Sequence, residues 1–192
     1  MRLRLATPLF FLALAAQGPA FAQDPDGLVT PDADTAESLE SRMAREAIAY
    51  EMPLPRGAPE QDYPLVAWCA ALVEGHIALG RTLTTADDLD RDIIRLGGLE
   101  ATDFRDALQA GRSRQTPATL AAARVAEAEA AGKWVPLMAQ EDERIRSQAF
   151  GLFFGLPGRC EHAARRVRDD ITTPPVTLDA AGLDEVGQPK PQ

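Results

Sequence analysis

Between residues 35 and 171, apolar side chains recur every three to four positions, which is the period of an α-helix. No segment alternates apolar and polar residues for long enough to predict a strand. The pattern therefore predicts an all-α protein, a helical bundle of about six or seven helices in a single domain, with disordered tails. We expect helices over residues 35–50, 62–80, 84–98, 102–111, 116–131, 137–154 and 158–171.

Capping residues set several of these boundaries. Asp62 is a good N-cap for the second helix, and Gly80 is a typical residue for its end. Thr116 followed by Pro117 is an N-cap followed by a proline at the first helical position. The glycine pair at 97–98 predicts that one helix ends there and another begins a few residues later.

The helix expected over residues 62–80 is apolar around most of its circumference. At about 100° per residue, a single arc collects the large side chains and one histidine, namely Leu65, Cys69, Leu72, His76 and Leu79, with Trp68 beside them. A helix of this kind is predicted to be the central element of the bundle. Gly75 in its middle predicts that another helix crosses closely.

His76 is the one titratable group in the middle of that arc, and it has two interpretations. Burial lowers the pKa of an imidazole, and a neutral imidazole can act as a base or a ligand. Alternatively, His76 is a core residue whose ring nitrogens bond to a backbone carbonyl or a neighbouring side chain. We favour the core interpretation, assign no catalytic residue, and retain His76 as a candidate functional residue.

The first 22 residues have the order of a secretory signal peptide. Arg2 and Arg4 precede an apolar stretch over residues 9–16, and an A-x-A site ends at Ala22. We expect cleavage near Ala22 and a mature protein in the periplasm, or secreted. The apolar run is too interrupted to predict a membrane span, and none is expected after cleavage.

Charge and composition limit the partners of the mature chain. The full chain has 20 basic and 29 acidic residues, and the signal peptide removes two of the basic ones, which leaves 18 against 29 and a net charge of −11. This acidic balance argues against nucleic acid and against anionic lipid as partners. Residues 23–34 and the Pro-rich residues 172–192 lack the apolar content that ordering requires, so we expect flexible tails on either side of a domain over residues 35–171.

The two cysteines are predicted to form a disulfide. Cys160 shares one stripe of the last helix with Ala163, Ala164 and Val167, so Cys69 and Cys160 each face the core. In an oxidising compartment such a pair is most simply bonded. The remaining faces of the last helix carry arginines whose acidic partners are expected four residues away, which gives a face neutralised within the helix.

No metal and no cofactor are expected. Cys69, His76, Cys160 and His162 have suitable residue types for zinc, but positions seven apart on a helix are about 10 Å apart along its axis. His162 is also projected onto the charged side of the last helix, away from Cys160. A Cys–His catalytic pair meets the same objection and would require a reduced thiol.

Residues 149–156 are apolar around the whole circumference, with glycines at 151 and 155 spaced for close approach by another helix. Core packing is the default interpretation. The alternative is an exposed aromatic patch around Phe150, Phe153 and Phe154, with Trp134 as a further candidate member, that binds a partner or an apolar ligand.

The sequence contains no motif that assigns a family, so three functions stay open. The preferred one is an accessory or protein-interaction module with an envelope protein as partner. The second is a carrier of small apolar ligands, with a pocket lined by Trp68, Phe150 and Phe153. The third is a hydrolase that uses His76, which requires a solvent-reachable cleft at that histidine.

Overall fold

The computed structural model describes residues 37–153, 155–184 and 187–189. The expected signal peptide over 1–22, the N-terminal tail over 23–34 and Phe154 of the expected aromatic patch lie outside the described residues. The described part is mostly helical and contains no strand, only an isolated bridge between Leu183 and Pro189, so the all-α prediction is confirmed. The elements are α1 (Leu39–Glu51), α2 (Asp62–Gly80), α3 (Asp88–Gly111), a 3₁₀ turn (Arg112–Arg114), α4 (Pro117–Gly132), α5 (Val135–Met138), α6 (Glu143–Gly151) and α7 (Arg159–Arg168).

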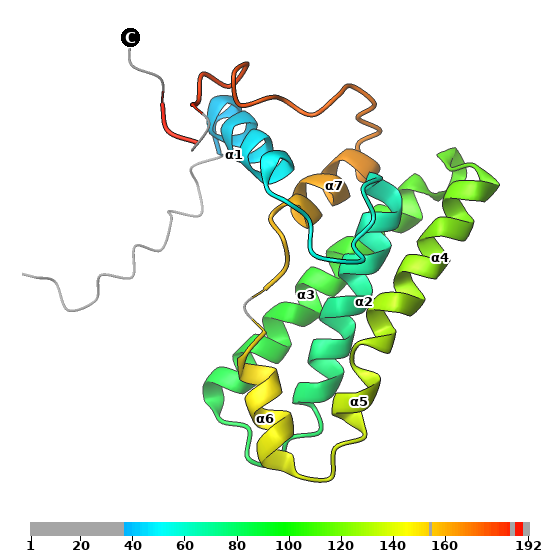
Figure 1. Ribbon diagram of the computed structural model, residues 1–192, viewed down its shortest axis with the longest axis vertical. Helices are drawn as coiled ribbons and strands as arrows, with labels where there is room; N and C mark the ends of the chain where they lie inside the picture. The colour runs from blue at the N-terminus through cyan, green and yellow to red at the C-terminus, as the bar shows by residue number, and fades with distance from the viewer. Residues whose placement is uncertain (1–36, 154, 185–186, 190–192) are drawn as a thin grey trace, which may run out of the picture. The chain divides into compact units, whose positions relative to one another are not determined.

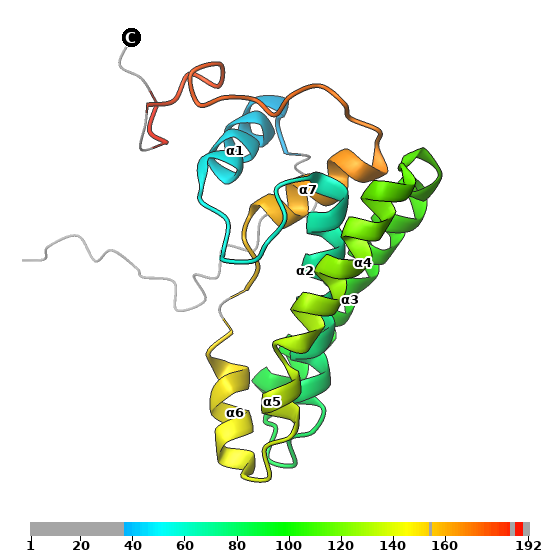
Figure 2. The same cartoon turned by 45° about the vertical axis from the view of Figure 1, so that its right-hand side comes forward.

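Helix α2 is the centre of the bundle. It packs along both α3 and α4, and the three helices run side by side (Figures 1 and 2). Helix α7 packs on α2 and α3, whereas α6 packs near the C-terminal end of α2 (Figure 1). Within the described residues, α2 is the one helix that is long and apolar enough to cross a membrane, but 83% of its apolar window is buried by neighbouring helices, as in the core helix of a bundle.

The glycine pair at 97–98 does not end a helix, which corrects the sequence prediction. Helix α3 continues through it to Gly111. A Cβ built on Gly97 would lie 3.1 Å from Cγ1 of Ile77, so α2 packs closely against α3 at this point. Contacts between the two helices outweigh the cost of about 1 kcal/mol that each glycine adds to a helix interior.

Trp134 explains Gly75, in place of the crossing helix that the sequence predicts. A Cβ on Gly75 would lie 2.0 Å from Cδ1 of Trp134, so the indole ring fills the space that the glycine leaves. Trp134 itself is held at the start of the short helix α5. The glycines at 151 and 155 have no atom of the described residues within 4 Å of an added Cβ, so the predicted close approach there is wrong.

The expected helix over 137–154 is split into α5 and α6, because Asp142 caps a new helix by accepting from the N–H of Arg144. Thr84 and Thr85 do not cap α3. Asp87 caps it instead, in a capping box with Asp90. Both threonines donate to the Glu143 carboxylate, which ties the loop before α3 to the first turn of α6 and lowers the pKa of Glu143 to about 2.

The C-terminal segment expected as a flexible tail has defined turns where it is described. Residues 178–182 form turns closed by backbone hydrogen bonds, and the N–H of Asp184 donates to the carbonyl of Gln188 at 2.8 Å. Leu183 is buried, and Gly187 approaches Ile48 of α1. A few apolar side chains thus give this segment contacts that its composition does not reveal.

Candidate functional site

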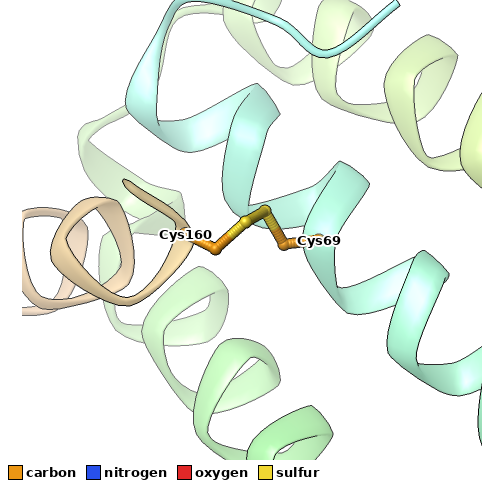
Figure 3. Close-up of a disulfide and its surroundings, with 2 residues drawn as sticks. All are labelled: Cys69 and Cys160. Carbon is orange, nitrogen blue, oxygen red and sulfur yellow. A yellow bond between two sulfur atoms is a disulfide. The ribbon is translucent and has the colours of Figure 1, made fainter. Parts of the chain in front are cut away.

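The two cysteines lie opposite each other between α2 and α7. Their sulfur atoms are bonded, and the Cα atoms of Cys69 and Cys160 are 6.1 Å apart (Figure 3). Both residues are fully buried, as the helical projection predicts. The bond fixes the first turn of α7 against the middle of α2. The described residues contain no group of three or more His, Cys, Asp or Glu side chains arranged to hold a metal.

His76 is a core residue in the structure. Only 6% of its surface is exposed, and its Nε2–H donates to the backbone carbonyl of Phe150 at 2.9 Å. Its ring stacks on Phe150 at 4.3 Å between centroids and packs at 4.5 Å against Phe153. Burial lowers the pKa of His76, which favours the neutral ring. The imidazole therefore makes a structural hydrogen bond and is enclosed by the aromatic rings around it.

The aromatic residues expected to line a ligand pocket are part of the core or packed against it. Trp68 and Phe150 are buried, and Phe153 is half-buried against the same cluster. An apolar depression lies elsewhere, at the first turn of α7. Its cavity volume is about 460 Å³, within the range of small-molecule sites.

This depression, the α7 groove, is built from three segments. The C-terminal half of α1 forms one side, residues 52–55 form a second, and residues 157–162 form the third. The apolar lining consists of Ile48, Ala49, Met52, Pro53, Leu54, Pro55 and Pro157. The polar residues at its border are Arg45, Arg159, Glu161 and His162.

Local sequence explains the shape of the α7 groove. Met52 leaves α1 in an extended conformation, with φ −64° and ψ 133°, because Pro53 follows it and disfavours the α-helical region for the residue before it. A second proline at 55 prevents the segment from re-entering a helix. The chain after α1 is therefore extended, and residues 52–55 form one wall of the groove, with Met52 and Leu54 in its lining.

A buried ionic network holds α1 on α7. Glu46 accepts from Nη1 of Arg166 at 2.8 Å and also from Arg165. Nε of Arg166 donates to Asp62 at 3.0 Å, and the Tyr50 hydroxyl donates to the second oxygen of Asp62 at 2.7 Å. Burial and the neighbouring Asp62 carboxylate raise the pKa of Tyr50.

These contacts correct the expected charge pairing of the last helix. Among the described residues, Arg165 and Arg166 pair with Glu46 of α1 and Asp62 of α2, not with the acids four residues away on α7. Glu46 and Tyr50 are site residues that sequence reasoning misses. One signal for Glu46 is its place between two small residues, because Ala47 and Ala49 lie on either side of it around the helix and are also buried.

His162 is buried at the α7 groove, not on a solvated face. It is 4% exposed, and burial lowers the pKa of its imidazole, which favours the neutral form. Within the part of the chain that the structure describes, its ring nitrogens have no hydrogen-bond partner. The projection of α7 had placed it on the charged side, and that side is covered by α1.

Comparisons of the chain with protein-family models, with curated proteins and with solved structures find no match. Function is therefore argued from the geometry alone.

Proposed function

We propose that the protein is an exported carrier that binds a small apolar molecule in the α7 groove. The observation behind this proposal is the groove itself, an open depression of about 460 Å³ with seven apolar residues and four polar residues at its border. Small-molecule sites combine an apolar lining with a few polar groups that fix orientation. Export rests on the signal peptide expected over residues 1–22.

Exposed apolar side chains at the groove support the same proposal. Met52 is 63% exposed and Ile48 is 38% exposed. When a ligand covers apolar surface and removes it from water, the binding free energy becomes more favourable by about 25 cal/mol per Å². A ligand that covers both side chains therefore gains most of its affinity at this position.

Two exposed side chains provide a matched test. Met52→Asp places a charge in the groove wall, and Leu89→Asp places one on α3, outside the groove, at a residue that is 67% exposed. We expect the neutral dye Nile red to bind the purified exported protein and to be displaced by decanol. Met52→Asp should weaken dye binding by about 10-fold or more, because one buried apolar side chain contributes about 1.5–3 kcal/mol, and Leu89→Asp should leave it unchanged. Equal binding by both variants and the parent protein would exclude the groove as the site.

A second function, a protein-interaction module with an envelope partner, is favoured by a different surface. Leu89, Leu96 and Leu99 are all well exposed on α3, at spacings of seven and three residues that keep them near one side of the helix. A photo-crosslinking residue at Leu96, introduced in whole cells, should capture a specific envelope protein if this function is correct. The same residue at Val125 of α4, which is exposed on a different helix, is the control. Capture from neither position, or equally from both, would count against the interaction surface.

A further inference from the structure

The first turn of α7 has backbone donors without a side-chain acceptor. Its N-cap is Gly158, which makes no side-chain capping bond, and the N-cap of α2 makes none either, whereas α1, α3, α4 and α6 are each capped by a polar side chain. The N–H groups of a first helical turn have no partner within the helix, and the helix dipole favours negative charge beside them. This turn borders the α7 groove.

His162 is the second, independent observation. Its side chain lines the groove wall and is 4% exposed, and no hydrogen bond among the described residues involves either ring nitrogen. Neither nitrogen is among the fully enclosed polar atoms that lack a partner, so both can be reached from the groove. A neutral imidazole has one N–H donor, so an acceptor that enters the groove can complete its hydrogen bonding.

Arg159 adds a positive charge that no described carboxylate balances. Its Nη2 donates to the carbonyl of Glu60 at 2.6 Å, and its guanidinium lies 4.4 Å from the centroid of the Tyr50 ring. The other arginine at the groove, Arg45, already pairs with Glu37 at 2.7 Å and with Glu161 at 3.5 Å. In a chain with a net charge of −9, this apolar groove therefore retains one uncompensated cation.

From these three observations we infer that the ligand of the α7 groove is an apolar monocarboxylate, a molecule of the medium-chain fatty acid class. The inference rests on the proposed carrier function. The apolar chain lies along Ile48, Met52 and Leu54, and the carboxylate lies at the start of α7. There it accepts from His162, from Arg159 and from first-turn N–H groups other than that of Cys160, which already donates to Pro157. A single negative charge fits one uncompensated guanidinium, whereas a phosphate monoester carries about −1.5 to −2 at pH 7 and would also lie near Glu161.

Decanoate and decanol separate the inference from the function on which it rests, because they have the same chain length and differ in charge. We expect both to displace Nile red from the exported protein at pH 8, decanoate with an affinity at least 10-fold higher. If neither ligand displaces the dye, the proposed function fails. If both bind equally well, the function stands and the carboxylate inference is overturned. Tighter binding of decyl phosphate than of decanoate would overturn the choice of carboxylate.

Two variants locate the charged group. Arg159→Gln should weaken decanoate about 10-fold and leave decanol unchanged, while Arg56→Gln, which removes an exposed arginine outside the groove, should change neither. Gly158→Asp places a carboxylate beside the first-turn N–H groups, and a Cβ at this position makes only an ordinary contact of 3.7 Å with Ala49. Gly158→Asp should likewise lower the affinity for decanoate and leave the affinity for decanol unchanged. Gly158→Asn, which has the same size without the charge, should lower the affinity for decanoate less. If Arg159→Gln and Gly158→Asp each lose as much affinity for decanol as for decanoate, the assignment of the carboxylate to α7 is overturned.

Discussion

At the scale of single residues, two helix-interior glycines differ in what lies beside them. A Cβ on Gly75 would be 2.0 Å from Trp134, and a Cβ on Gly98 would have no atom of the described residues within 4 Å. Gly75→Ala should therefore destabilise the protein by about 1–3 kcal/mol through overpacking. Gly98→Ala should stabilise it by about 0.5–1 kcal/mol, because alanine loses less conformational freedom in a helix. Urea unfolding of the two variants measures both effects, and a gain in stability for Gly75→Ala would show that Trp134 has room to move.

Sequence reasoning succeeds at residues whose own helix has a pattern that shows which side faces the core. The large-residue arc of α2 is enough to predict that Cys69 and His76 are buried, and both are. It fails at His162, because a helical projection gives the direction of a side chain and not the element that covers that direction. Here α1, more than a hundred residues earlier in the chain, covers the side of α7 that carries Arg165, Arg166 and His162.

At the scale of elements, α1 is attached through charges as much as through apolar contacts. Glu46 is buried and accepts from both Arg165 and Arg166, so Glu46→Gln removes the carboxylate that the two guanidinium groups share and leaves the buried Arg166 with Asp62 alone. Removal of one partner from a buried ion pair typically costs about 3–5 kcal/mol. We expect the free energy of unfolding to fall by about 3 kcal/mol, near the lower value, because Arg165 is partly exposed and water can solvate it.

The loss should be concentrated in α1, where hydrogen exchange of the helix amides would accelerate more than exchange in α2. Glu40→Gln is the matched control, because Glu40 lies on the same helix, is exposed and makes no ion pair with the described residues. If the two glutamine variants have the same stability, the network does not hold α1 on α7.

Helix boundaries were predictable where a side chain caps its own helix, as Thr116 does for α4. They were not predictable where a distant contact decides, as at Gly97, where Ile77 packs. The α7 groove was not predictable for the same reason, because contacts between distant segments form it. Its walls come from residues 45–55 and 157–162, two segments that share no pattern and become neighbours only when α1 docks on α7.

For the molecule as a whole, the disulfide is the link that most restricts the unfolded chain. Cys69 and Cys160 are 91 positions apart, and closing a loop of that length stabilises a protein by about 4–5 kcal/mol in the chain-entropy model. The double variant Cys69→Ala/Cys160→Ala should lose about that amount in urea unfolding. Equal unfolding midpoints for the variant and the parent protein would show that the bond contributes nothing to stability, and thiol titration of the denatured parent should find no free sulfhydryl.

The same variant should loosen the two ends of α7 unequally. Its C-terminal end is held independently, because Arg114 donates to the carbonyl of Val167 at 2.6 Å and pairs with Asp170 at 2.9 Å. Its first turn depends on Cys160, the second residue of the helix. Loss of the bond should therefore accelerate hydrogen exchange in the first turn of α7 more than in the last turn, and it should weaken Nile red binding at the groove even in solutions where the variant stays folded. Uniform acceleration along α7, with dye binding retained, would mean that the disulfide stabilises the whole fold without positioning the groove.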